Sequence, residues 1–341
     1  MLTRTLIFAC LSLCLMRSTV SGQSNDYGEI RFSTSKPMFS AVFMVERIRE
    51  VVSDDEIISG LSSGFLELWG VDLEQTEKFY VQQDFVLGAI PHSSVPMFTL
   101  NWQTNEPIDT ETVMTGKLWS EVRGGAMTKE TYNGIELFVT DETGPSLCFP
   151  DEYTASLSFE SGNKAMIDRM SKETPPAQYD WIQNYFEIAG SFNFESHVDE
   201  TESALREVFG GAPFANDKFF AAIRLIKSGY FRVEAKSKEC LEVVLSANSE
   251  DDAETIAKTM KDTFTDVLVT LQELKEELER WGDESGGINL VVALSEVFGN
   301  ATAQADGEHV KIQVQQEGGM VKVLKALANQ MNYFFSMMSR R

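Results

Sequence analysis

The sequence predicts an α+β fold in which antiparallel sheets carry helices on one face, organised as two related halves. Residues 98–103 alternate apolar and polar side chains, which is typical of a half-buried strand. An Asn-Gly pair at 133–134 separates two strand-like runs and indicates a tight hairpin. Residues 249–281 keep apolar side chains three and four positions apart, which predicts a long amphipathic helix.

The first elements follow from local spacing and capping. A helix is expected to start at Lys36-Pro37 and to run to about residue 51, because apolar side chains recur there at three- to five-residue spacings. These side chains are Phe39, Val42, Phe43, Ile48 and Val51. Ser53 and Glu56 form a capping box, so a second helix is expected with Ser53 as its N-cap and an end near Gly70.

The rest of the chain continues to mix strands and helices. In its first half, strands are predicted at 79–83, 98–103, 146–149 and 153–159, and helices at 109–122 and 163–170. In its second half, strands are predicted at 188–194, 230–235, 240–246, 302–305 and 310–314. Helices are predicted there at 199–209, 216–227, 249–281, 288–298 and 321–338, and Ser249 with Asp252 forms a second capping box.

The domain organisation follows from one break and one internal repeat. Thr174-Pro175-Pro176-Ala177 interrupts regular structure, so residues 23–174 and 178–341 are expected to form two α+β units. Strand 98–103 is followed by Asp109-x-Glu-Thr, and strand 241–246 is followed by the same pattern at Asp252, 143 positions later. This repeat is the reason to expect that the two halves are related.

Residues 1–22 have the three parts of a secretory signal peptide. Arg4 supplies the positive charge, an apolar run extends from Thr5 to Met16, and cleavage is expected between Gly22 and Gln23. A membrane-spanning helix needs about 20 apolar residues, and the run from Thr5 to Met16 is shorter than that. The mature protein is therefore expected to be secreted or periplasmic, with no stable membrane insertion. Cys10 leaves lipid attachment as an alternative.

The net charge of the chain limits the classes of molecule that it is expected to bind. Its 341 residues include 29 Lys and Arg against 52 Asp and Glu, a formal net charge of −23. Phosphate backbones would repel such a chain, which argues against nucleic acid as a partner. Acidic clusters at 54–56, 199–202 and 250–252 fall at expected helix starts, where the helix dipole favours carboxylates. Weak calcium binding is the alternative interpretation of these clusters.

Few residues of the sequence suggest a catalytic, cofactor-binding or metal-binding role. His92, His197 and His309 have no metal-ligand spacing, and we expect no catalytic, cofactor-binding or metal-ligating residue and no cofactor. Residues 60–64 match G-x-S-x-G, which in a hydrolase places the serine at a strand-to-helix turn. Here the match lies inside a predicted helix, so helix interruption or close packing of its glycines is the favoured interpretation. A secreted serine hydrolase using Ser62 is the alternative.

Two cysteines remain beyond the signal peptide. Cys148 and Cys240 both lie in strand-like runs. In an oxidising compartment they could form a disulfide, and they could equally be two buried thiols, so the sequence leaves both interpretations open.

Several short motifs together resemble known families. They are Gly70-Val71-Asp72-Leu73-Glu74-Gln75, Tyr132-Asn133-Gly134-Ile135, Cys148-Phe149-Pro150-Asp151-x-Tyr153 and Ala247-Asn248-Ser249-Glu250-Asp251-Asp252-Ala253. With the signal peptide, they resemble families of secreted proteins of planctomycete-type bacteria whose function is unknown. The resemblance implies an exported α+β protein and supplies no catalytic residues.

The expected function is therefore binding or structural rather than enzymatic. Exposed sheet edges or helix grooves would contact an envelope or extracellular protein or ligand. The apolar residues of 331–338 are expected to face the core or a partner, with a membrane-surface helix as the alternative.

Overall fold

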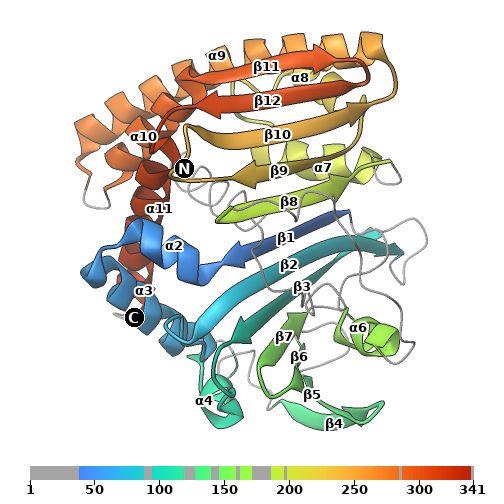
Figure 1. The fold of residues 1–341 in the computed structure, drawn as a ribbon, viewed down its shortest axis with the longest axis vertical. Coiled ribbons are helices and arrows are strands. Elements are labelled where there is room, and N and C mark those ends of the chain that lie inside the picture. Colours follow the sequence, from blue (N-terminus) through green and yellow to red (C-terminus); the bar gives the residue numbers. More distant parts are fainter. Residues whose placement is uncertain are drawn as a thin grey trace. The chain divides into compact units, whose positions relative to one another are not determined.

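The computed structural model describes residues 38–87, 94–117, 119, 127–139, 146–158, 162–170, 186–195, 198–283 and 286–338 (Figure 1). They divide into two compact units. The first unit contains the described residues up to Glu187 and those from Phe334 onward, and the second contains those of Ile188–Tyr333. Helices and antiparallel strands occur in both, which confirms the α+β class. The expected signal peptide and the boundary at 174–177 lie outside the described residues.

The first unit contains seven antiparallel strands, in the spatial order β1-β2-β3-β7-β6-β5-β4. Their bounds are β1 Phe39–Met44, β2 Thr76–Leu87, β3 Ser94–Thr104, β4 Thr128–Tyr132, β5 Ile135–Val139, β6 Ser146–Asp151 and β7 Thr154–Ser158. The predicted hairpin joins β4 to β5: Asn133 and Gly134 have φ angles of 48° and 85°. Two consecutive left-handed residues make a turn whose twist suits a two-residue hairpin, so this prediction is confirmed.

One face of this sheet carries the main apolar core of the first unit. The helices of this unit are α2 Val45–Val52, α3 Asp55–Trp69, α4 Thr110–Met114 and α6 Gly162–Met170, together with the end of α11 Gly319–Met338. Phe79, Trp102 and Leu147 of the sheet belong to one cluster with Leu61 and Phe65 of α3 and Val113 of α4. Helices α3 and α4 therefore cover this face, whereas α6 packs on the opposite face of the same sheet.

The predicted helix over 37–51 is wrong in its first half. Residues 39–44 form strand β1, paired in register with β2, and the helix starts only at Val45. Five of the six residues of β1 are buried, so the strand lacks the polar alternation that identifies a half-exposed strand. Its apolar residues continue into α2 and imitate a helical spacing.

Two helix limits also differ from the prediction. Ser53 is not the N-cap of α3: it has a left-handed φ of 45° and ends α2, while the Asp54 side chain accepts from the backbone N–H of Ile57. Helix α4 ends at Met114 instead of continuing through 122, and Thr115 and Gly116 follow it in a turn. Asp109 is the N-cap of α4, where its carboxylate accepts from the N–H groups of Glu111 and Thr112.

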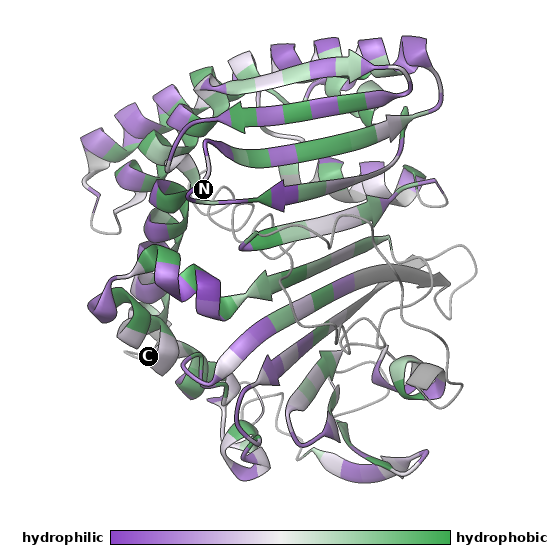
Figure 2. Cartoon of the chain, in the orientation of Figure 1, coloured by the Kyte–Doolittle hydropathy of each residue, from purple (hydrophilic) through white to green (hydrophobic). Residues whose placement is uncertain are grey.

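The second unit contains five antiparallel strands, in the order β11-β12-β10-β9-β8. Their bounds are β8 Ile188–Asn193, β9 Ile226–Val233, β10 Glu239–Ala247, β11 Ala301–Asp306 and β12 His309–Gln315. Hydrophilic and hydrophobic residues alternate along β12 (Figure 2). The helices are α7 Val198–Phe209, α8 Asp217–Ile223, α9 Glu250–Trp281, α10 Gly287–Gly299 and most of α11.

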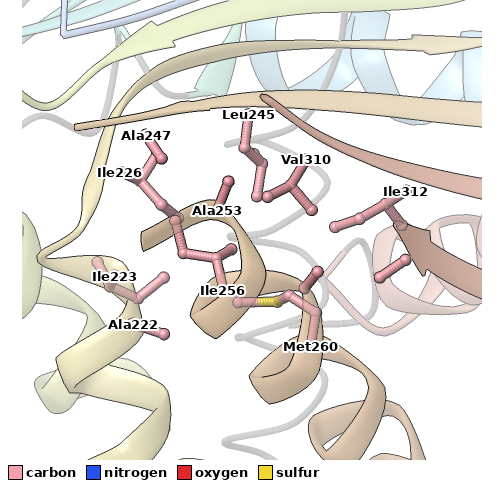
Figure 3. Packing of buried hydrophobic residues seen from close by; sticks show 12 residues of the cluster. Ala222, Ile223, Ile226, Leu245, Ala247, Ala253, Ile256, Met260, Val310 and Ile312 are labelled. Carbon is pink, nitrogen blue, oxygen red and sulfur yellow. The ribbon is translucent and has the colours of Figure 1, made fainter. Parts of the chain in front are cut away.

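The core of the second unit lies between this sheet and α9. Figure 3 shows Ile256 and Met260 of α9 beneath Leu245, Val310 and Ile312 of the strands. Ser249 caps α9 by accepting from the N–H of Asp252, as predicted. The predicted helix over 216–227 is too long, because Ile226 already starts β9 although it continues the apolar spacing of α8.

The acidic clusters at 54–56 and 250–252 do begin helices α3 and α9, which confirms their expected position. The predicted repeat corresponds to β3 with α4 and to β10 with α9. Because α4 has 5 residues and α9 has 32, a relation between the halves stays a prediction. Within the described part of the chain, no helix is long and apolar enough to cross a membrane.

Candidate functional site

The face of the first unit's sheet opposite its main apolar core is lined by neutral polar side chains. In an antiparallel sheet, residues opposite each other in register point to the same face. One such row crosses five strands, and a second row crosses β2, β3 and β7 beside it. The first row is Ser40, Gln82, Thr99, Ser158 and Ser146; the second is Tyr80, Asn101 and Ser156. We call these eight residues the polar face.

All eight residues of the polar face are at most 5% exposed. This corrects the sequence-based expectation of a half-buried strand at 98–103, because Thr99 and Asn101 are buried along with Trp102 on the other side. Burying a polar group is unfavourable unless it is hydrogen-bonded, so the partners of these side chains decide what the face can do.

Part of the polar face is satisfied by helix α6. The Asn163 amide nitrogen donates to the carbonyl oxygens of Ser146 and Ser156 at 2.9 and 3.1 Å, and its Oδ1 accepts from Ser156 Oγ at 2.8 Å. The Asn163 backbone N–H donates to Ser158 Oγ at 2.7 Å. Helix α6 then covers Leu137 and Cys148 with Met166 and Ile167. This part of the face therefore serves to attach α6 to the sheet.

Asn101 differs from Asn163 in that its side-chain amide is not hydrogen-bonded. It lies on β3, with Tyr80 of β2 and Ser156 of β7 as its register neighbours, and it is only 2% exposed. Neither its Nδ2 nor its Oδ1 has a hydrogen-bond partner. A carboxamide can donate two hydrogen bonds and accept two, and leaving such atoms buried and unpaired costs about 1–3 kcal/mol each. Asn101 is thus the residue of the polar face that calls for a partner from outside the chain.

The polar residues of β3 and β7 carried a sign of burial in the sequence, although the alternation of apolar and polar residues along β3 suggested a half-exposed strand. The polar residues of β3 and β7 are all uncharged: Ser94, Thr99, Asn101, Gln103, Thr104, Thr154, Ser156 and Ser158. Strand faces that meet water usually carry Lys, Glu or Arg, which are seldom buried. An uncharged polar side on two neighbouring strands could therefore have indicated burial.

Ser62 lies in the interior of helix α3 and is buried. Its hydroxyl donates to Asp72 Oδ1 at 3.1 Å, and the same oxygen accepts from the N–H of Glu74 at 2.8 Å. Gly64 of the same motif is in close contact with Phe335. This arrangement fixes the segment after α3 and differs from the exposed strand-to-helix turn of a hydrolase nucleophile.

Cys148 and Cys240 are both free and buried. Burial raises the pKa of the Cys148 thiol to about 12 and raises that of Cys240 as well. Since the thiolate is the reactive form, neither group is suited to nucleophilic chemistry at neutral pH. The question left open by the sequence is therefore answered by two buried thiols.

The other candidate residues have structural or surface environments. His309 is exposed and its Nδ1 lies 3.3 Å from Ser246 Oγ, while His92 and His197 lie outside the described residues. Glu202, from the acidic cluster at 199–202, pairs with Arg206 and Arg224, and these contacts lower its pKa. Among the residues that the structure places, no three or more His, Cys, Asp or Glu side chains are grouped to hold a metal ion.

The comparisons with known proteins identify no family for this chain. No protein-family model and no curated protein matches the chain. The structure of TP0453 in crystal form I is similar over 87% of this chain and 96% of that chain, with a TM-score of 0.40 and 10% sequence identity.

Proposed function

We propose that this chain is an exported, non-enzymatic protein that acts in the periplasm or at the cell surface by binding a ligand on the polar face. Residues 1–22, with Arg4 and the apolar run after it, support export. The net charge of −23 argues against nucleic acid as the ligand. Buried thiols and a serine hydroxyl engaged with Asp72 argue against Cys148, Cys240 or Ser62 as a nucleophile.

The observation that carries this proposal is the unpaired amide of Asn101. A leucine, whose side chain has the same number and branching of heavy atoms, would occupy this position without the cost of burying two polar atoms. The neighbouring Asn163 shows that the same sheet can satisfy an asparagine fully with its own groups. The amide of Asn101 is therefore best explained by a group that does not belong to the chain.

An ordered water could satisfy the same amide, so the experiment must separate water from a ligand. Thermal unfolding is measured with three compound classes: neutral monosaccharides, their anionic derivatives and short neutral peptides. The proteins are wild type, Asn101→Leu and the control Asn105→Leu, whose asparagine follows the same strand but is exposed. A ligand present at about 100 times its Kd adds about 2.7 kcal/mol to the folded state.

The expected result is that at least one class raises the unfolding midpoint of the wild type and of Asn105→Leu in a saturable way. Asn101→Leu should fold and show no such increase. If no class stabilises the wild type, or if Asn101→Leu responds as strongly as the control, the polar face is not a ligand site.

A further inference from the structure

The turn between β4 and β5 carries a chemically labile asparagine. Asn133-Gly134 is the one Asn-Gly pair in the sequence. Both residues are exposed, and both have a left-handed φ. We propose that Asn133 deamidates spontaneously to a carboxylate, and that this change loosens helix α6 from the sheet of the first unit.

The reaction follows from the chemistry of the two residues. The backbone nitrogen of Gly134 loses its proton to water and attacks Cγ of Asn133; the Cγ–Nδ2 bond breaks, and ammonia leaves with a proton taken from water. Water then opens the cyclic imide at either carbonyl group, which gives aspartate or isoaspartate. Glycine favours the first step because it has no Cβ to shield its nitrogen. A Cβ built on Gly134 would have nothing within 4 Å, so the turn is open to water.

The turn can reach the reactive geometry because it lies at the edge of the sheet. The Asn133 amide nitrogen donates to Asp168 Oδ1 at 2.9 Å, and this contact must break before the side chain can turn towards Gly134. Strand β4 is paired on one side only, with β5. Edge elements with exposed backbone open locally at a small cost in free energy. The amide is therefore released transiently while the protein stays folded.

Deamidation turns the contact with α6 from attraction into repulsion. Asp168 Oδ1 accepts from Asn133 Nδ2 and, at 3.0 Å, from the Tyr132 hydroxyl. An aspartate at 133 has no side-chain N–H to donate, and it places a second carboxylate beside Asp168. An isoaspartate also adds one carbon to the backbone, which does not suit a two-residue turn. The ion pair between Lys164 and Glu130 remains, so α6 is loosened rather than released.

Loosening of α6 has a measurable consequence at Cys148. Met166 and Ile167 of α6 pack on Leu137 and Cys148 of the sheet, and Cys148 is 0% exposed. A thiol reagent therefore reaches Cys148 only when this packing opens. Cys240 is equally buried in the second unit, so its labelling shows whether the opening is confined to the first unit.

The modification itself is tested by incubating the wild type at mildly alkaline pH and mapping its peptides by mass spectrometry. The peptide that contains Asn133 should gain about 1 Da with time and separate into an aspartate and an isoaspartate form. Asn105 is exposed in the same unit but is followed by Glu106, so it should keep its amide. If Asn133 reacts no faster than Asn105, the proposed site is wrong.

The effect on α6 is tested with Asn133→Asp, which carries the aspartate product from the start. It should lower the thermal unfolding midpoint and speed the labelling of Cys148 about fivefold or more, with the labelling of Cys240 unchanged. Asn105→Asp adds the same charge at an exposed position and should change neither quantity. Asn133→Asp combined with Asp168→Asn restores an amide–carboxylate pair with the roles exchanged, so Cys148 should again be labelled as slowly as in the wild type.

Three outcomes contradict the proposed loosening of α6. The first is that Cys148 is labelled at the same rate in Asn133→Asp and in the wild type. The second is that the double variant shows no recovery, which removes the role of Asp168. The third is faster labelling of Cys148 and Cys240 together, because opening of both units is not a change confined to α6.

Discussion

Two buried asparagines on one side of the same sheet differ in how their amides are satisfied. Asn163 is hydrogen-bonded to Ser146, Ser156 and Ser158, whereas both amide atoms of Asn101 lack a partner. A saturated amide stabilises the fold, and an unpaired one destabilises it. The two positions should therefore respond to mutation in opposite directions.

Replacing Asn163 with Ala should lower the free energy of unfolding by about 1–3 kcal/mol, because buried groups of Ser146 and Ser156 lose their partner. Asn101→Leu, measured without ligand, should leave the free energy unchanged or raise it. Urea unfolding followed by circular dichroism measures both. Equal losses at the two sites would contradict the structural distinction between them.

The sequence predicts β3 but not the environment of its polar side. Phe98, Leu100 and Trp102 alternate with polar residues, and this period correctly indicates a strand. Which side meets water depends on what covers the sheet, and such long-range packing leaves no trace in a local period. The uncharged polar residues of β3 and β7 hint at burial, but the position of Asn101 between Tyr80 and Ser156 is known only from the pairing of the strands.

At the scale of elements, the packing of the end of α11 against α3 depends on the small residue Gly64. A Cβ atom built on Gly64 would lie 2.4 Å from Cγ of Phe335. Phe335 also packs against Phe65, with ring centroids 5.2 Å apart. Gly64 therefore allows a close contact that a larger residue would obstruct.

Gly64→Ala should destabilise the protein by about 1–3 kcal/mol through overpacking, although alanine favours the helix by about 1 kcal/mol. Gly299→Ala, at the end of α10, is the matched control because a Cβ there meets nothing within 4 Å, and it should not destabilise. Combining Gly64→Ala with Phe335→Leu should recover part of the loss. Thermal unfolding measures all three; stabilisation by Gly64→Ala would contradict the contact.

The elements that the sequence predicts best are those whose local and long-range signals agree. Helix α9 has a cap at Ser249 and one continuous apolar face, and its limits match the prediction. Strand β1 is the opposite case, because its burial on both sides removes the period that identifies strands. The end of α8 fails for a related reason, since Ile226 suits the core of a helix and of a strand equally.

For the whole molecule, acidic side chains set the response to pH. Hydrogen bonds from Arg206 and Arg224 lower the pKa of Glu202, and those from Lys322 and Gln316 lower the pKa of Glu296. The carboxylate of Asp109 is likewise stabilised, mainly by Thr112, which lowers its pKa. These contacts favour the ionised form in the folded state.

Because these folded-state pKa values lie below the unfolded value of about 4.3 for Glu and 3.9 for Asp, their stabilisation is complete above those values. It should be lost as the pH falls through the folded-state values. Urea midpoints measured across this range should decline towards acid, and Glu202→Gln should make the decline shallower. Glu254→Gln, on an exposed position of α9, is the control and should leave the slope unchanged.

The last residues of α11 belong to the first unit, where Phe335 lies against Gly64 and Phe65. In the sequence these residues follow the whole of the second unit, so translation adds them after the other described residues of the first unit. Domains generally fold in the order in which they are translated, but the first unit lacks Phe335 until the second unit has been translated. A nascent polypeptide that stops short of Phe335 would thus lack the aromatic side chain that packs on Gly64, so this contact can form only after the second unit has been synthesised.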